Sequence, residues 1–91
     1  MKGKRKGYPR VEVEWLDSAG MAEWGGEDEY QKQRPLIIKS VGYLLNKGSG
    51  HVTLVQNVDE NRKMNGSMSI PRSVVRKITV LTSGRDSDKT A

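Results

Sequence analysis

Apolar side chains recur at every second position along much of this chain, and this period of two constrains the fold more than any other feature. Val11, Val13 and Trp15 alternate with Glu12 and Glu14, which is typical of a strand with one face on a core and the other in water. Further β-forming stretches cover residues 36–45, 51–58, 64–70 and 77–81. The sequence therefore predicts five strands and almost no helix.

Glycine, proline and runs of polar residues mark the connections between these strands. Short connections are expected at 46–50, at 59–63 and at 71–76, where one turn of 3₁₀ helix would join the last two strands. Residues 17–35 predict a long loop with a short helical turn near 28–32, which Pro35 stops. Gly42 lies inside the longest strand and predicts a bend or a bulge there.

These elements favour one small antiparallel β-barrel, closed or nearly closed. An open five-stranded sheet of this size would leave an apolar face and two edges bare. The hydrophobic content of 34% is enough for one modest core. We expect a flexible basic arm at 1–10, the barrel at 11–82 and a disordered tail at 83–91.

The net charge of +5 belongs to the amino-terminal arm. Five of the 16 basic residues lie in the first ten positions without one acid, so residues 11–91 hold 11 basic and 11 acidic residues. The predicted barrel is therefore formally neutral, with acids in the long loop and bases near the last strands.

Several classes of protein are disfavoured by composition. No apolar run is long enough for a membrane span, and the basic start lacks the apolar stretch of a signal peptide. The absence of cysteine removes thiolate chemistry and sulfur-ligated metals. We expect a cytoplasmic protein without a cofactor.

The half of the chain from Val41 to Leu81 resembles the SH3-like and Sm-like small barrels. The resemblance rests on three segments. Residues 41–45 would form a bent strand and residues 52–55 its hairpin partner, and residues 69–78 would form a strand, a short turn and a closing strand. Ile70 and Arg72 match the closing turn of Sm-like proteins, but Pro71 intervenes and the usual glycine is missing. Over residues 11–81 the pattern is also similar to that of small bacteriophage-encoded proteins of unknown function. That second resemblance implies a viral accessory protein in the cytoplasm of a bacterial host.

Catalysis and metal binding are poorly supported by the residues. His51 is the one histidine, and nothing in the spacing pairs it with a serine and a carboxylate. The acids of the long loop lack the alternating spacing and central glycine of a calcium loop. We therefore expect a protein that is not an enzyme.

Binding remains as the expected function, and two partners are open. The first is a host or phage protein, bound by exposed aromatic and acidic side chains: Trp24, Tyr43, Glu27, Asp28 and Glu29. Trp24 would either close one end of the barrel or be presented to a ligand, and with Tyr43 beside it would form an aromatic recognition site. Exposed barrel edges also leave self-association open.

The alternative partner is RNA or DNA, held by basic side chains of the arm and of the closing turn. The candidates are Lys2, Lys4, Arg5, Lys6, Arg10, Arg62, Lys63, Arg72, Arg76 and Lys77. Such a stripe would bind phosphates without sequence preference. Few aromatic residues are available to stack on bases, which weighs against this alternative.

Overall fold

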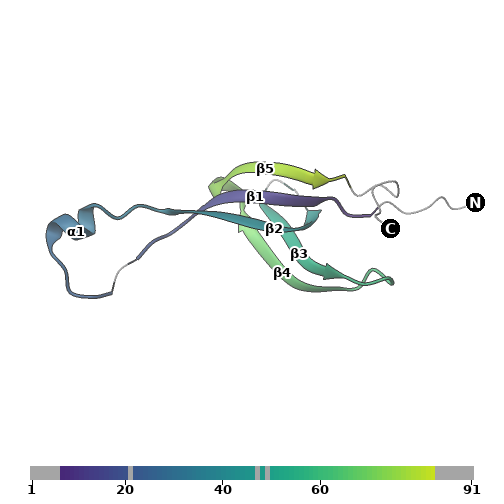
Figure 1. Ribbon diagram of the computed structural model, residues 1–91, viewed down its shortest axis with the longest axis horizontal. Coiled ribbons are helices and arrows are strands. Elements are labelled where there is room, and N and C mark those ends of the chain that lie inside the picture. Colours follow the sequence, from purple (N-terminus) through teal and green to yellow (C-terminus); the bar gives the residue numbers. More distant parts are fainter. Residues whose placement is uncertain (1–6, 21, 47, 49, 84–91) are drawn as a thin grey trace, which may run out of the picture.

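The computed structural model describes residues 7–20, 22–46, 48 and 50–83, and most of its regular structure is β-strand (Figure 1). The strands are β1 (Arg10–Asp17), β2 (Leu36–Asn46), β3 (His51–Val58), β4 (Met64–Pro71) and β5 (Val75–Thr82). A short helix, α1 (Glu27–Gln31), lies in the loop between β1 and β2, and the 3₁₀ turn η1 (Arg72–Val74) joins β4 to β5. The predicted all-β class, with five antiparallel strands and a long loop after the first, is confirmed.

The strands form one curved sheet in the order β4-β3-β2-β1-β5. In the described part of the chain β4 and β5 are the outer strands and no ladder joins them, so the sheet is not closed into the expected barrel. The sheet nevertheless curves around one core. The buried members of this core are Val11, Val13, Val52, Leu54 and Ile70, and those packed against them are Trp15, Leu44, Val74, Val75 and Ile78. All five strands and η1 contribute to this core.

Trp15 packs against this core and also makes a polar contact, as an indole does when one edge is buried. Its Nε1–H donates to Ser40 Oγ at 3.0 Å. Ser40 pairs with Val13, and Trp15 pairs with Ile38, across the β1–β2 ladder. The alternation in β1 thus places its odd-numbered residues on the inner face, as the sequence predicts.

Strand β2 changes its neighbour at Gly42 and Tyr43. Its first part pairs with β1 as far as Tyr43, whereas only its end, from Tyr43 to Asn46, pairs with β3. A Cβ atom at Gly42 would lie 2.9 Å from the carbonyl oxygen of Val55 and 3.2 Å from the Cβ of Leu54. The missing side chain therefore lets β3 approach β2 closely at the corner of the sheet.

The amino-terminal residues differ from the prediction. Strand β1 begins at Arg10, and the amide of Leu44 donates to the carbonyl of Pro9 at 2.8 Å, which continues the β1–β2 pairing. The predicted arm therefore does not extend to residue 10, because Tyr8, Pro9 and Arg10 contact the sheet. Residues 1–6 of the arm and 84–91 of the predicted tail lie outside the described residues.

The turn between β3 and β4 is held by one carboxylate. Asp59 Oδ1 accepts hydrogen bonds from the amides of Asn61 and Lys63, each at 2.8 Å. Arg62 adopts a left-handed conformation with φ of 66°. Among the described residues, no helix is long and apolar enough to cross a membrane.

The corner at Gly42 gives a test of the fold. We expect Gly42→Ala to lower the free energy of unfolding by about 1–3 kcal/mol, because the added methyl group would press on the backbone of β3. Urea unfolding followed by tryptophan fluorescence measures the change. Gly20→Ala is the matched control, since nothing lies within 4 Å of a Cβ there, and it should change stability by less than about 0.5 kcal/mol. Equal effects of the two substitutions would contradict this account of the corner.

Candidate functional site

The loop between β1 and β2 projects from one end of the sheet and carries α1 near its tip (Figure 1). We call residues 16–37 the loop arm, of which Met21 is not among the described residues. Glu29 Oε1 accepts from the amide of Gly26, the N-cap residue of α1, at 3.1 Å. Three acids, Glu27, Asp28 and Glu29, occupy the first turn, where they interact favourably with the positive end of the helix dipole. The predicted helical turn is confirmed. The capping contact of Glu29 and the acids of the first turn explain why the helix begins here.

Trp24 is fully exposed on this arm, so it does not close the barrel. Together with Ala22, Glu23, Gly25 and Tyr30 it lines a shallow depression of about 370 Å³. The hydroxyl of Tyr30 donates to the carbonyl of Glu23 and ties α1 to the segment that carries the indole. The arm therefore has internal hydrogen bonds that order it around Trp24.

Apolar side chains also lie exposed at the base of the arm. Leu16 pairs with Ile37 in the β1–β2 ladder, on the face opposite to the core. Leu36, the residue before Ile37, pairs with Asp17. Leu36 and Ile37 are 55% and 54% exposed. Exposed apolar side chains thus lie both at the base of the arm and, in Trp24, on the arm itself, and such groups are frequent at binding sites.

Tyr43 does not belong to this surface. It lies seven positions along β2 from Leu36, which corresponds to roughly 23 Å of extended strand, and it pairs with Arg10 at the other end of the β1–β2 ladder. The expected aromatic site of Trp24 beside Tyr43 is therefore wrong. The reason is that β2 stays extended and paired with β1 over this whole length, which separates its two ends.

The basic candidates divide into two groups, apart from Lys2, Lys4, Arg5 and Lys6, which lie outside the described residues. Arg10 and Arg62 lie over aromatic rings, at 5.9 Å from the centroid of Tyr43 and 4.4 Å from that of Tyr8. Arg10 Nε also donates to Thr82 Oγ1 at 2.7 Å. These two guanidinium groups fasten the amino-terminal segment to the sheet, and Lys63 follows Arg62 in the same turn.

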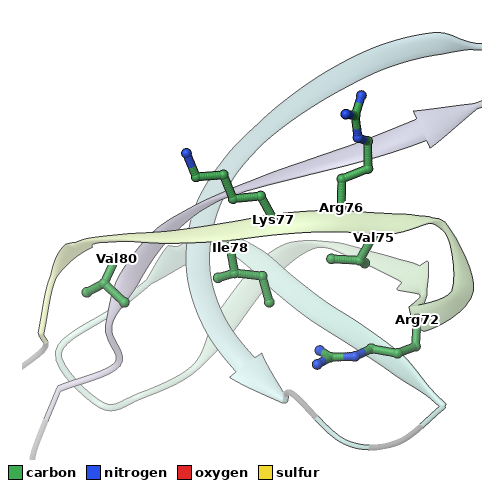
Figure 2. Close-up of a pocket in the computed structure, with 6 residues that line it drawn as sticks. All are labelled: Arg72, Val75, Arg76, Lys77, Ile78 and Val80. Atoms are coloured by element: carbon green, nitrogen blue, oxygen red, sulfur yellow. The ribbon is translucent and has the colours of Figure 1, made fainter.

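The second group, Arg72, Arg76 and Lys77, gathers around β5 (Figure 2). Simple alternation would place Arg76 and Lys77 on opposite faces of the strand. In the structure Glu14 pairs with Lys77 but Trp15 pairs with Val75, so Arg76 is an extra residue in a β-bulge. Figure 2 shows both side chains on the same side of β5, with Val75 and Ile78 on the other. The sequence predicts that these basic residues lie near one another, but it carries no signal for the bulge that brings Arg76 and Lys77 to one side of β5.

A depression of about 350 Å³ runs along this part of β5, lined by Arg72, Val75, Arg76, Lys77, Ile78 and Val80. Arg76 Nε lies 3.8 Å from Glu14 Oε2, and the Arg76 side chain remains 48% exposed. The lining residues come from both faces of the strand (Figure 2). Since β1 covers the inner edge of β5, the depression follows the outer edge.

His51 and the acidic side chains are also groups that a chemical site could use in the part of the chain that the structure describes. His51 is exposed, and its Nε2 lies 3.3 Å from the side-chain amide of Asn46. Among the described residues, no group of three or more histidines and carboxylates is placed to hold a metal ion.

Comparison with known proteins adds no relative: no family model, no curated protein and no solved structure matches this sequence. The two resemblances from the sequence pattern therefore stay predictions.

The hydrogen bond inside the loop arm can be tested separately from binding. We expect Tyr30→Phe to speed trypsin cleavage after Lys32 by severalfold, because losing the hydroxyl frees α1 from the carbonyl of Glu23. The free energy of unfolding should change by less than about 1 kcal/mol, since the arm lies outside the core. Tyr43→Phe removes a hydroxyl group at the other end of β2 and is the control. Equal cleavage rates for the two variants would contradict an ordering role for Tyr30.

Proposed function

We propose that this protein is a non-enzymatic binding module that docks onto a partner protein through its loop arm. The observation that carries the proposal is the fully exposed indole of Trp24 on an internally bonded loop. Tryptophan is among the residues that contribute most to protein interfaces when it enters a pocket of the partner. The proposal follows from the surface that the arm presents.

The size of the apolar contribution fits this role. Burying a whole tryptophan side chain removes roughly 200 Å² from water, which is worth up to about 5 kcal/mol at ~25 cal/mol per Å². Because hydrogen bonds already order the arm around Trp24, little further ordering is needed on binding. Leu16, Leu36 and Ile37 add exposed apolar side chains at the base of the arm.

The acids of the arm indicate the chemistry of the partner. Glu23 and the three first-turn acids of α1 lie close to Trp24 in sequence, whereas the bases Lys32 and Arg34 follow α1. A basic rim around an apolar pocket would complement this arrangement, with the charges steering the encounter and the indole holding the complex. If the phage resemblance holds, the partner is a protein of the bacterial host or of the phage, met in the bacterial cytoplasm.

The central test is a crosslinking experiment at the tip of the arm. With a photoreactive phenylalanine analogue in place of Ala22, which lines the same depression as Trp24, we expect discrete adducts in an extract of the cells that make the protein. Unlabelled wild-type protein should compete for these adducts, and the Trp24→Ala protein should compete at least roughly tenfold less well. Leu81→Ala, which shortens an exposed apolar side chain far from the arm, should compete as wild type. Equal competition by the wild-type and Trp24→Ala proteins would overturn the proposal.

Nucleic-acid binding is the competing proposal, supported by the basic residues around β5 and in the first six positions. It predicts affinity for mixed RNA or DNA that falls steeply with salt and that falls further when residues 1–6 are deleted. This shorter deletion leaves β1 intact, since the strand begins at Arg10. The absence of binding at low salt would exclude this alternative.

A further inference from the structure

Strand β5 is an edge of the sheet with an unusual distribution of charge. In the described part of the chain it has one strand neighbour, β1, so its outer edge presents backbone donors and acceptors that no ladder uses. The depression along this edge combines three cations with the apolar side chains Val75, Ile78 and Val80. An edge with this lining suits an added strand. The backbone of such a strand would pair with the free donors and acceptors, and its side chains would contact the apolar and the charged residues of β5.

The strand already paired with β5 shows what sequence this edge accepts. In β1, Glu14 lies opposite Lys77 and Glu12 opposite Thr79, whereas Val13 lies opposite Ile78. The acidic residues of β1 therefore lie beside β5 on the face of the sheet that points away from the core. The apolar residues of β1 lie on the face that points toward the core. A strand added on the free edge would meet the same alternation, with the bulged Arg76 as a further cation beside Lys77, whereas Arg72 lies on the other side of β5 with Val75 and Ile78 (Figure 2).

Other occupants fit this edge less well. Two copies of β5 side by side would bring Arg76 and Lys77 of each copy close together, and like charges across strands are destabilising. The acidic segment of the loop arm is helical in α1 and so is not an extended strand. A nucleic acid would use the cations but has no use for the backbone edge or for the apolar positions.

We infer that the outer edge of β5 binds an extended segment of a partner protein in which acidic and apolar residues alternate, and that this segment adds to the sheet as a sixth strand. The edge β4 is not equivalent, because it carries no charged residue and ends at Pro71. This second surface is separate from the loop arm, and its test does not depend on the function proposed above.

The test uses a fluorescent peptide with the sequence Thr-Val-Glu-Val-Glu-Val-Thr and the whole protein. We expect binding by fluorescence anisotropy at about 50 mM salt, with affinity at least roughly tenfold higher than that of the peptide in which glutamine replaces glutamate. A version methylated on alternate backbone nitrogens, which cannot donate to the edge, should not bind. Amide chemical shifts should move mainly in residues 75–82 and in their β1 partners.

Substitutions in the protein complete the test. Arg76→Gln combined with Lys77→Gln should weaken the acidic peptide by roughly tenfold, whereas Arg34→Gln with Lys63→Gln makes the same change in net charge and should weaken it less than about twofold. Trp24→Ala should leave this binding unchanged. The circular dichroism spectrum of each variant shows whether it is folded, and peptide controls on the wild-type protein keep the proposal testable if a variant is not.

Several results would overturn the inference. These are no binding of the acidic peptide up to about 1 mM, equal affinity for its glutamine version, binding of the methylated version, or shifts confined to the loop arm. Binding of a mixed single-stranded DNA of about 20 nucleotides that the Arg76 and Lys77 substitutions abolish, without peptide binding, would assign the edge to nucleic acid instead.

Discussion

The close approach of β3 to Gly42 is the constraint on which the rest of the structure depends. A Cβ atom at this position would meet the Val55 carbonyl oxygen at 2.9 Å, so the corner needs a residue without a side chain. At this corner β2 leaves the β1 ladder and joins β3, and Gln56 Nε2 donates to the Val41 carbonyl where the ladder is missing. The two halves of the sheet can then enclose one core between β1 and β3.

This core is small and is made of aliphatic side chains. Its five fully buried members are valine, leucine and isoleucine, and the large aromatic Trp24 lies outside it. Features that bear on function are therefore held at the periphery, in the loop arm at one end and along the outer edge of β5. Changes in the loop arm leave the core intact, which is how small folds carry different binding surfaces on one scaffold, whereas Val75 and Ile78 of β5 also pack against the core.

The sequence predicts what depends on local pattern. Alternation from Val11 to Trp15 identifies β1 and its inner face, and the acids before Tyr30 identify the start of α1. What it does not predict depends on pairing between distant segments. The bulge opposite Glu14 and Trp15 brings Arg76 and Lys77 to one side of β5, and the uninterrupted β1–β2 ladder separates Tyr43 from Trp24.

The distribution of charge also depends partly on the local sequence and partly on the pairing of distant segments. The net charge of +5 lies mainly in the first ten residues, and the remainder is balanced, yet the structure places acids on the loop arm and cations along β5. Attraction between these opposite surfaces would link copies of the chain, but charge alone does not fit a helix into a strand position. Since α1 satisfies its own backbone by helical hydrogen bonds, it offers no edge for β5 to extend. Conformation, rather than net charge, therefore decides which acidic segment this edge can bind.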